Sequence, residues 1–218
     1  MENNRKFYHL NEIFQEYKYV FPDTNAFLEF GTYFDQKGLF NKISQEERRI
    51  ALFDFWKENF SKYEGFFITK KVFEELKEGS YNYNKASKRT SANKFVVKLR
   101  RVKRDSNKKR NEFLNVLNSN NLYVLEKDSE EEVLYNELSS KYDYFNRGLD
   151  KIHPADFDLL ITGGVFSKLK GKTAIISNDS PMRRIWSRFI KNENINPYNL
   201  GFYFQKGLGS FEKGFFNR

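Results

Sequence analysis

Acidic residues follow two of the strands that the sequence predicts. Asp23 comes directly after the strand expected at 19–21 and its closing proline, and Asp179 follows the strand expected at 173–176. Parallel strands end at the same edge of a sheet, so we expect both carboxylates at one edge. An Asp that stands alone in such a place is also a common turn or capping residue. The chemistry therefore depends on whether further acids reach that edge.

Two predicted helices bring further acids to the same edge. One carries Glu74, Glu75 and Glu78, and the other carries Asp156 and Asp158 in its first turn. Carboxylates that converge without a neutralising lysine repel one another. A hard divalent cation such as Mg²⁺ or Mn²⁺ is the usual partner of such oxygen ligands. Because these ions activate water and stabilise phosphoryl charge, the acids predict phosphodiester hydrolysis.

The composition excludes several other kinds of catalytic and metal site. The chain has 218 residues, no Cys and only two His, His9 and His153, which excludes thiol catalysis, Cys-ligated zinc and His-rich metal sites. With 39% hydrophobic and 18% aromatic residues, it can fill a sizeable core. No apolar run approaches the ~18 residues of a membrane helix, and the first residues lack the apolar stretch of a signal peptide. We therefore expect a cytoplasmic protein without membrane contact.

Short apolar strands alternate with helical stretches along the chain. The strands are expected at 19–21, 66–68, 122–125 and 173–176, with a last one at 202–204. This alternation is typical of the α/β class. We expect a three-layer α/β/α sandwich with a mainly parallel central sheet. The residues after 207 show no clear period.

Capping residues mark where several helices begin. Thr69 and Asp128 suit N-cap positions. His153 and Pro154 suit the start of the helix that follows, because proline is favoured in a first helical turn. Ser180, which precedes another proline, is expected to be the N-cap of the helix after the strand at 173–176.

Positive charge is concentrated in one segment. The whole chain carries a formal +9, but residues 88–110 hold eleven basic residues against one acid, a net +10, which leaves −1 elsewhere. A solvated helix face would also explain a charged run, yet clustering without interleaved acids favours phosphate binding. Residues 103–112 contain no apolar side chain and are expected to be exposed. The candidate nucleic-acid-binding residues are Lys94, Lys98, Arg100, Arg101, Lys103, Arg104, Lys108, Lys109 and Arg110.

Four segments, taken in order, resemble those of one enzyme family. They are VFPDTN at 20–25, ITKKVFEEL at 68–76, PADFDLL at 154–160 and IISND at 175–179. In the PIN-domain ribonucleases a strand is followed by Asp-Thr/Ser-Asn, a helix starts with an I-T-x-x-V-x-x-E-L pattern, and a later strand ends in T/S-x-D. The chain resembles that family over most of its length.

The resemblance implies that four acids are catalytic and bind metal. They are Asp23, Glu75, Asp156 and Asp179. Asp158 also fits the pattern and remains an alternative metal ligand to Asp156. Three neighbours would orient the ligands, namely Thr24, Asn25 and Ser177. The implied cofactor is one or two Mg²⁺ or Mn²⁺ ions.

The resemblance also implies a single PIN-like domain over residues 1–218. This domain would include a basic helical insertion at about 80–112 and a C-terminal extension at about 190–218, both of which small family members lack. After the third acid, small members have alanine-rich packing. This chain has Thr162-Gly163-Gly164 there, which we expect to weaken the helix locally.

Together these features predict a metal-dependent endoribonuclease that hydrolyses single-stranded RNA, as a toxin-type or RNA-processing enzyme. RNA is favoured over DNA as the partner, and the family also implies a homodimer and an antitoxin-like inhibitor as candidate partners. One alternative is a non-catalytic nucleic-acid-binding protein on a PIN-like scaffold, which would have no use for four convergent carboxylates. A flap-type DNA nuclease is the other alternative, and nothing in the sequence separates it from an RNA nuclease.

Overall fold

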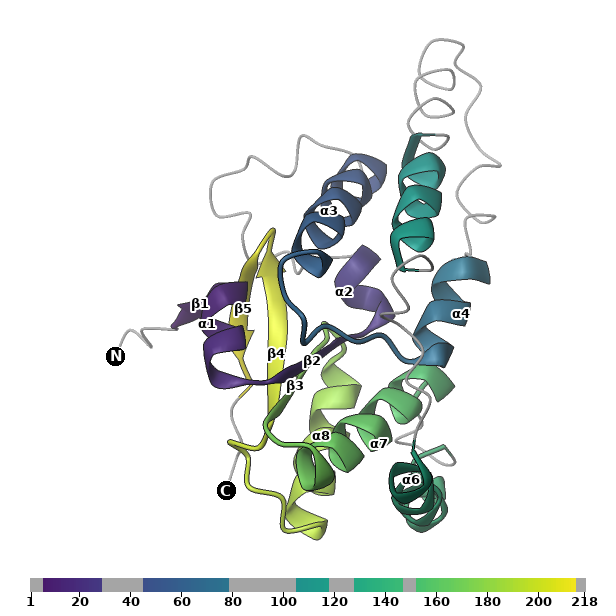
Figure 1. Ribbon diagram of the computed structural model, residues 1–218, viewed down its shortest axis with the longest axis vertical. Coiled ribbons are helices and arrows are strands. Elements are labelled where there is room, and N and C mark those ends of the chain that lie inside the picture. The colour runs from purple at the N-terminus through teal and green to yellow at the C-terminus, as the bar shows by residue number, and fades with distance from the viewer. Residues whose placement is uncertain (1–5, 29–44, 79–104, 118–127, 147–151, 215–218) are drawn as a thin grey trace.

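A five-stranded sheet in the order β1-β5-β4-β3-β2 forms the centre of the fold (Figure 1). The computed structural model describes residues 6–28, 45–78, 105–117, 128–146 and 152–214. The strands are β1 Phe7–Tyr8, β2 Tyr19–Pro22, β3 Thr173–Ile176, β4 Leu200–Gly207 and β5 Ser210–Lys213. Strands β2, β3 and β4 run parallel, whereas β5 pairs antiparallel with β4 and β1. The α/β class is confirmed, but the sheet is mixed rather than mainly parallel.

The antiparallel half of the sheet arises from a tight hairpin. Strand β4 turns at Leu208 and Gly209 and returns as β5. Gly209 has a φ of 72°, a left-handed conformation that glycine adopts without strain. Strand β5 then pairs with Phe7 and Tyr8 near the start of the chain. The region predicted to be a C-terminal extension therefore supplies two strands of the central sheet.

The parallel half of the sheet fixes the edge at which the acids were expected. The register aligns Pro22 of β2 with Ile176 of β3. Beyond these ends, the Asp23 amide donates to the Ile176 carbonyl at 2.9 Å, and the Ser177 amide donates to the Tyr203 carbonyl at 2.9 Å. Because the hydrogen bonds continue one residue past each strand, the backbone at Asp23 is held as firmly as the sheet itself.

Helices pack against both faces of the sheet, because successive strand residues point to opposite sides. On β3, Ala174 and Ile176 face one hydrophobic core and Ile175 faces the other. The first core includes residues of α1 Leu10–Glu16, α2 Thr24–Leu28, α3 Gln45–Phe60, α4 Lys70–Glu78 and the helix over 105–117. The second includes α6 Ser129–Lys141, η2 Asp143–Asn146, α7 Pro154–Leu169 and α8 Ser180–Asn192. No helix among the described residues is long and apolar enough to cross a membrane.

Most of the predicted helix starts are confirmed. Thr69 and Asp128 accept backbone hydrogen bonds at the starts of α4 and α6, and α7 begins at Pro154. The start of α8 was predicted one residue too late. Its N-cap is Asp179, whose extended backbone and carboxylate suit the position, so Ser180 already lies inside the helix.

Two of the predicted strands have different outcomes. The segment at 66–68 forms only one parallel bridge, between Val20 and Phe66, rather than a full strand. The strand predicted at 122–125 lies outside the described residues. The strand predicted at 202–204 is confirmed as the middle of β4.

Helix α7 is buried along most of its length and carries Asp156 in its first turn. Two glycines allow its close packing. A Cβ atom at Gly163 would lie 3.0 Å from the Ile175 side chain, and one at Gly164 would lie 2.5 Å from the Phe189 ring. The glycines were expected only to weaken this helix. Instead they let α7 approach β3 and α8.

Candidate active site

Four acids from four different elements lie at the carboxyl edge of the parallel strands. Asp23 follows β2, and Asp179 follows β3 as the N-cap of α8. Asp156 lies in the first turn of α7, and Glu75 lies on α4. We refer to these four residues as the acid edge.

Asp23 is almost completely buried, with 1% of its surface exposed. Its Oδ1 accepts a hydrogen bond from the Ala26 amide at 2.8 Å, whereas Oδ2 is buried without a hydrogen-bond partner among the described residues. Burial and the nearby charge of Asp179 raise the pKa of Asp23 to about 7, against the opposing effects of Ser177 and of the Ala26 and Asn25 amides. A buried carboxylate oxygen without a donor is costly, and a cation would satisfy it.

The pKa of Asp156 shows that the four acids lie within electrostatic range of one another. Asp156 is 8% exposed. Burial, followed by the charges of Asp23, Asp179 and Glu75 in that order, raises its pKa to about 8. No Lys or Arg is among the largest influences that the described residues exert on this pKa. Asp156 is therefore mostly protonated at neutral pH while the neighbouring negative charge remains uncompensated.

Glu75 links α4 to α2 and α7. The Thr24 hydroxyl donates a hydrogen bond to Glu75 Oε2 at 2.5 Å. On the other side, His153 Nδ1 lies 3.6 Å from Glu75 Oε1, and 60% of the His153 side chain is exposed. From the sequence, His153 was expected only to start a helix, which it does as the N-cap of α7. Its position three residues before Asp156 is the signal that could have revealed this contact.

Ser177 organises the loop between β3 and α8. Its Oγ accepts a hydrogen bond from the Asp179 amide at 3.0 Å. Asp179 in turn caps α8, because its Oδ1 accepts from the Met182 amide at 3.3 Å. Ser177 is fully buried, and its hydroxyl also lowers the pKa of Asp23. The side chain predicted to orient ligands therefore acts on both strand-end acids.

Asp158 faces α6 instead of the acid edge. Residues two positions apart on a helix point in different directions. The Tyr135 hydroxyl, on α6, donates to Asp158 Oδ1 at 2.5 Å. Burial and the charge of Asp158 raise the pKa of Tyr135 above its usual range. Asp158 thus joins α6 to α7, and of the two alternatives only Asp156 lies with the other acids.

Three of the predicted nucleic-acid-binding residues lie on the described helix over 105–117. Lys109 Nζ lies 2.9 Å from Asp54 Oδ1 on α3 and 3.6 Å from Glu112 Oε2, and Lys108 Nζ lies 4.0 Å from Glu112 Oε1. This helix also buries Ser106, so the expectation that residues 103–112 are wholly exposed was wrong. The third residue is Arg110. The other candidates, Lys94, Lys98, Arg100, Arg101, Lys103 and Arg104, lie outside the described residues.

The acid edge fits a hard divalent cation by the chemistry of its donors. Carboxylate and hydroxyl oxygens are the ligands that Mg²⁺ and Mn²⁺ prefer. Asp23 Oδ2 is a buried oxygen that no described residue satisfies with a hydrogen bond. Among the described residues, no three His or acidic side chains converge closely enough to hold an ion as they stand. Because like charges repel, carboxylates without a cation are expected to stand apart. Ion binding would therefore need some of these side chains to rotate toward one another.

No family model, curated protein or solved structure matches the chain. The structure itself establishes an α/β fold with carboxylates beyond the ends of parallel strands. Open α/β sheets commonly bind ligands at such an edge. The function is therefore inferred from the acid edge and the residues around it.

Proposed function

We propose that the chain is a PIN-like, metal-dependent endoribonuclease, built as a three-layer α/β/α sandwich with the acid edge as its active centre. The observation that carries this proposal is the placement of acids from four elements beyond the ends of the parallel strands. Burial and the charges of Asp23, Asp179 and Glu75 together raise the pKa of Asp156 there to about 8. Uncompensated negative charge of this kind costs folding free energy. A bound divalent cation would offset that cost.

In this proposal the four acids share one role, and two neighbouring side chains orient them. The residues that would hold one or two Mg²⁺ or Mn²⁺ ions are Asp23, Glu75, Asp156 and Asp179. The metal, when bound, would activate water and stabilise the negative charge of the phosphodiester. Thr24 orients Glu75 through its hydroxyl hydrogen bond. Ser177 holds the Asp179 backbone and favours the charged form of Asp23.

Single-stranded RNA is the substrate class we favour. The sequence from 88 to 110 carries a net +10, enough to hold several phosphates away from the cut. In the described part of that segment, Lys108 keeps 76% of its side chain exposed. Lys109, by contrast, is engaged with Asp54. The exposed cations would therefore supply affinity for the strand, and the acid edge would supply the chemistry.

Cleavage of a fluorescent single-stranded RNA in Mn²⁺ tests the proposal. Asp23→Asn keeps the size of the side chain and removes its charge, and we expect it to slow cleavage by about 100-fold or more. Asp158→Asn is the matched control, because it removes a charge from the same helix as Asp156 and still accepts the Tyr135 hydrogen bond. We expect this control to cleave like the wild type. Cleavage by Asp23→Asn at the wild-type rate would contradict the proposal.

The same assay separates the two other candidate functions. Faster cleavage of branched DNA than of single-stranded RNA would identify a flap-type DNA nuclease. Salt-sensitive RNA binding by a wild-type protein that cleaves neither substrate would identify a non-catalytic binding protein. In the first case, the comparison with Asp23→Asn shows whether the acid edge carries out the DNA cleavage.

A further inference from the structure

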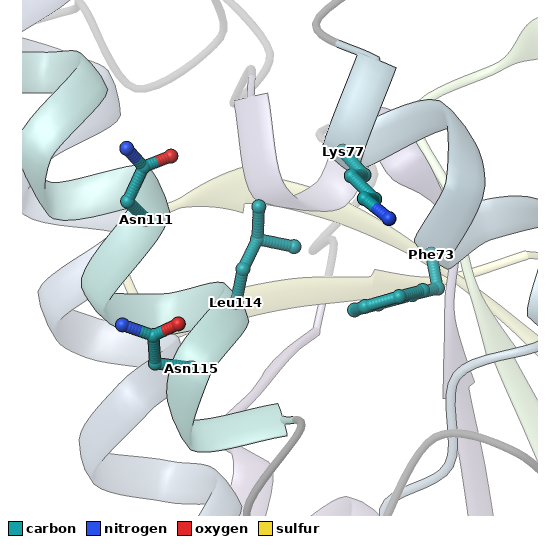
Figure 2. A pocket seen from close by; sticks show the side chains of 5 residues that line it. All are labelled: Phe73, Lys77, Asn111, Leu114 and Asn115. Atoms are coloured by element: carbon teal, nitrogen blue, oxygen red, sulfur yellow. The ribbon is translucent and has the colours of Figure 1, made fainter.

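A cavity of about 410 Å³ lies between α4 and the helix over 105–117 (Figure 2). Its lining residues are Phe73 and Lys77 from α4, and Asn111, Leu114 and Asn115 from the facing helix. The volume lies within the range of small-molecule sites, about 300–1,000 Å³. The cavity is large enough for a nucleotide-sized ligand.

The two helices are anchored so that these side chains line the cavity. Val72 and Leu76 of α4 are buried in the first core, as are Phe113 and Leu117 of the facing helix. The lining residues recur at spacings of three or four, which places them together on one side of each helix. Burial of the apolar positions therefore determines which side chains border the cavity.

The lining combines the groups that recognise a nucleobase. Figure 2 shows the Phe73 ring and the Leu114 side chain reaching into the space between the helices. An aromatic face and an aliphatic side chain suit a flat ring, and every nucleobase offers such a ring for stacking. The amides of Asn111 and Asn115 can donate to and accept from the edge of a base, as asparagine does with adenine. The Lys77 ammonium can pair with a phosphate.

The polar side chains that line the cavity have no partner in the described part of the chain. Lys77, Asn111 and Asn115 form no hydrogen bond or ion pair with another residue in the described part of the chain. None of the described residues that line the cavity is a carboxylate, so none of them repels a phosphate. We propose that this cavity binds one unstacked nucleobase of the single-stranded RNA substrate, an inference that rests on the proposed function.

Helix α4 connects this cavity to the acid edge. It carries Phe73 and Lys77 on the side of the cavity and Glu75 on the side of α2. The two sides are separated by roughly the 10–12 Å diameter of a helix with its side chains. A strand that lodges one base beside Phe73 would have to pass around α4 to be cut at the acid edge. Because paired bases stay stacked, this arrangement selects an unpaired strand.

The experiment measures binding of a fluorescein-labelled ten-nucleotide RNA in EDTA, where cleavage does not occur. Phe73→Leu keeps an apolar side chain and removes the aromatic face, and we expect affinity to fall roughly 5- to 100-fold. Phe55→Leu is the matched control, because Phe55 also packs partly buried against the first core but does not line the cavity. We expect no change for this control. Asn115→Ala, on the helix surface, should weaken binding several-fold without affecting folding.

A second set of RNAs, each with one base removed, identifies the base that occupies the cavity. For the wild type, removal of that base should weaken binding as much as Phe73→Leu does. Combined with Phe73→Leu, the same removal should cost little more, because both changes delete one contact. Additive losses at every position, or unchanged affinity for both Phe73→Leu and Asn115→Ala, would overturn the inference. Since binding is measured without metal, coupling between Phe73 and one base would stand even if the protein failed to cleave RNA.

Discussion

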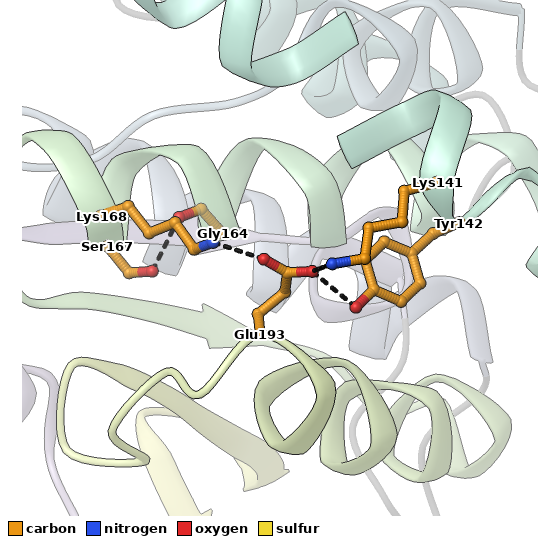
Figure 3. A network of polar contacts seen from close by, with 6 residues as sticks. All are labelled: Lys141, Tyr142, Gly164, Ser167, Lys168 and Glu193. Atoms are coloured by element: carbon orange, nitrogen blue, oxygen red, sulfur yellow. Dashed lines mark hydrogen bonds and ion pairs between the residues drawn. The ribbon is translucent and has the colours of Figure 1, made fainter. Parts of the chain in front are cut away.

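Buried carboxylates in two regions of this fold have opposite surroundings. Glu193, the C-cap of α8, keeps 6% of its side chain exposed and contacts Lys141, Lys168 and Tyr142 (Figure 3). Its Oε1 lies 2.6 Å from Lys141 Nζ and 2.7 Å from the Tyr142 hydroxyl, and its Oε2 accepts from Lys168. Burial opposes the charge of Glu193, but these partners outweigh it and lower its pKa to about 2. At the acid edge, burial and neighbouring acids instead raise the pKa of Asp156 to about 8.

The comparison indicates what each carboxylate is for. The Glu193 group joins the ends of α6, α7 and α8, and its charges are compensated within the fold. None of the four acids of the acid edge forms an ion pair with a Lys or Arg among the described residues. In the same fold, Glu193 is paired with two lysines, so buried acids in this protein can be neutralised by lysine. Uncompensated acids at a sheet edge are therefore better explained by function than by stability.

Among the substitutions that test this contrast, Asp156→Asn should have the largest effect. We expect RNA cleavage in Mn²⁺ to fall by about 100-fold or more, because a ligand is lost. In EDTA at pH 8 we expect the melting temperature to rise, because the variant removes a buried charge that its neighbours repel. Cleavage assays and thermal unfolding of the same preparation measure both effects. A variant that loses stability together with activity would show that Asp156 is a structural acid, as Glu193 is.

The stability of the metal-free protein should fall as pH rises from about 5 to 8.5. The folded-state pKa values of Asp23 and Asp156, about 7 and about 8, lie above the ordinary value of 3.8. The folded state therefore retains protons that the unfolded state has lost, and it loses this advantage as pH rises through those values. We expect the melting temperature to drop on the order of 10 °C, with Mn²⁺ restoring most of it. A melting temperature that is independent of pH in EDTA would contradict the presence of uncompensated negative charge at the acid edge.

Glu193→Gln should have the opposite profile to Asp156→Asn. Glutamine lacks the negative charge and has one acceptor oxygen instead of two for Lys141 and Lys168, so we expect a loss of about 2 kcal/mol in the free energy of unfolding. Cleavage by the folded variant should match the wild type, because Glu193 binds residues of α6 and α7 rather than the acid edge. Urea unfolding and cleavage at a temperature where the variant is folded measure the two effects. Loss of cleavage without loss of stability would contradict a structural role for Glu193.

Thr24→Val should have the smallest effect. It removes the hydroxyl that donates to Glu75 Oε2 at 2.5 Å and keeps the shape of the side chain. We expect Mn²⁺ affinity to fall about tenfold, since groups that orient metal ligands typically contribute that much. Isothermal titration calorimetry measures this change, and Thr24→Ser should restore the affinity. Equal affinities for Thr24→Val and the wild type would place Glu75 outside the metal site.

The parts of the fold that depend on near neighbours could be predicted from the sequence. The caps at Thr69 and Asp128 depend on residues within one helical turn. The mixed sheet could not be predicted, because it depends on a pairing between the two ends of the chain. Phe7 pairs with Glu212, and neither segment shows strand periodicity. Two-residue strands such as β1 are formed by tertiary contacts rather than by local preference.

The site shows the same division between local and tertiary information. The expectation that Asp23 and Asp179 share an edge followed from the geometry of parallel strands. The hydrogen bond from Thr24 to Glu75 and the contact of His153 with Glu75 depend on how α2, α4 and α7 pack together. Spacing along the chain does not encode that packing. For the same reason the sequence left Asp158 as an alternative ligand, whereas the structure pairs it with Tyr135.

Anomalous diffraction from crystals grown near pH 8 with Mn²⁺ tests the metal site most directly. We predict at least one anomalous peak at the acid edge, with an oxygen of Asp23 and an oxygen of Asp156 about 2.0–2.2 Å from the ion. The same peak should be absent from Asp23→Asn crystals soaked at the same concentration. Wild-type crystals that show no peak among the four acids at millimolar Mn²⁺ would contradict the assignment of the acid edge as a metal site.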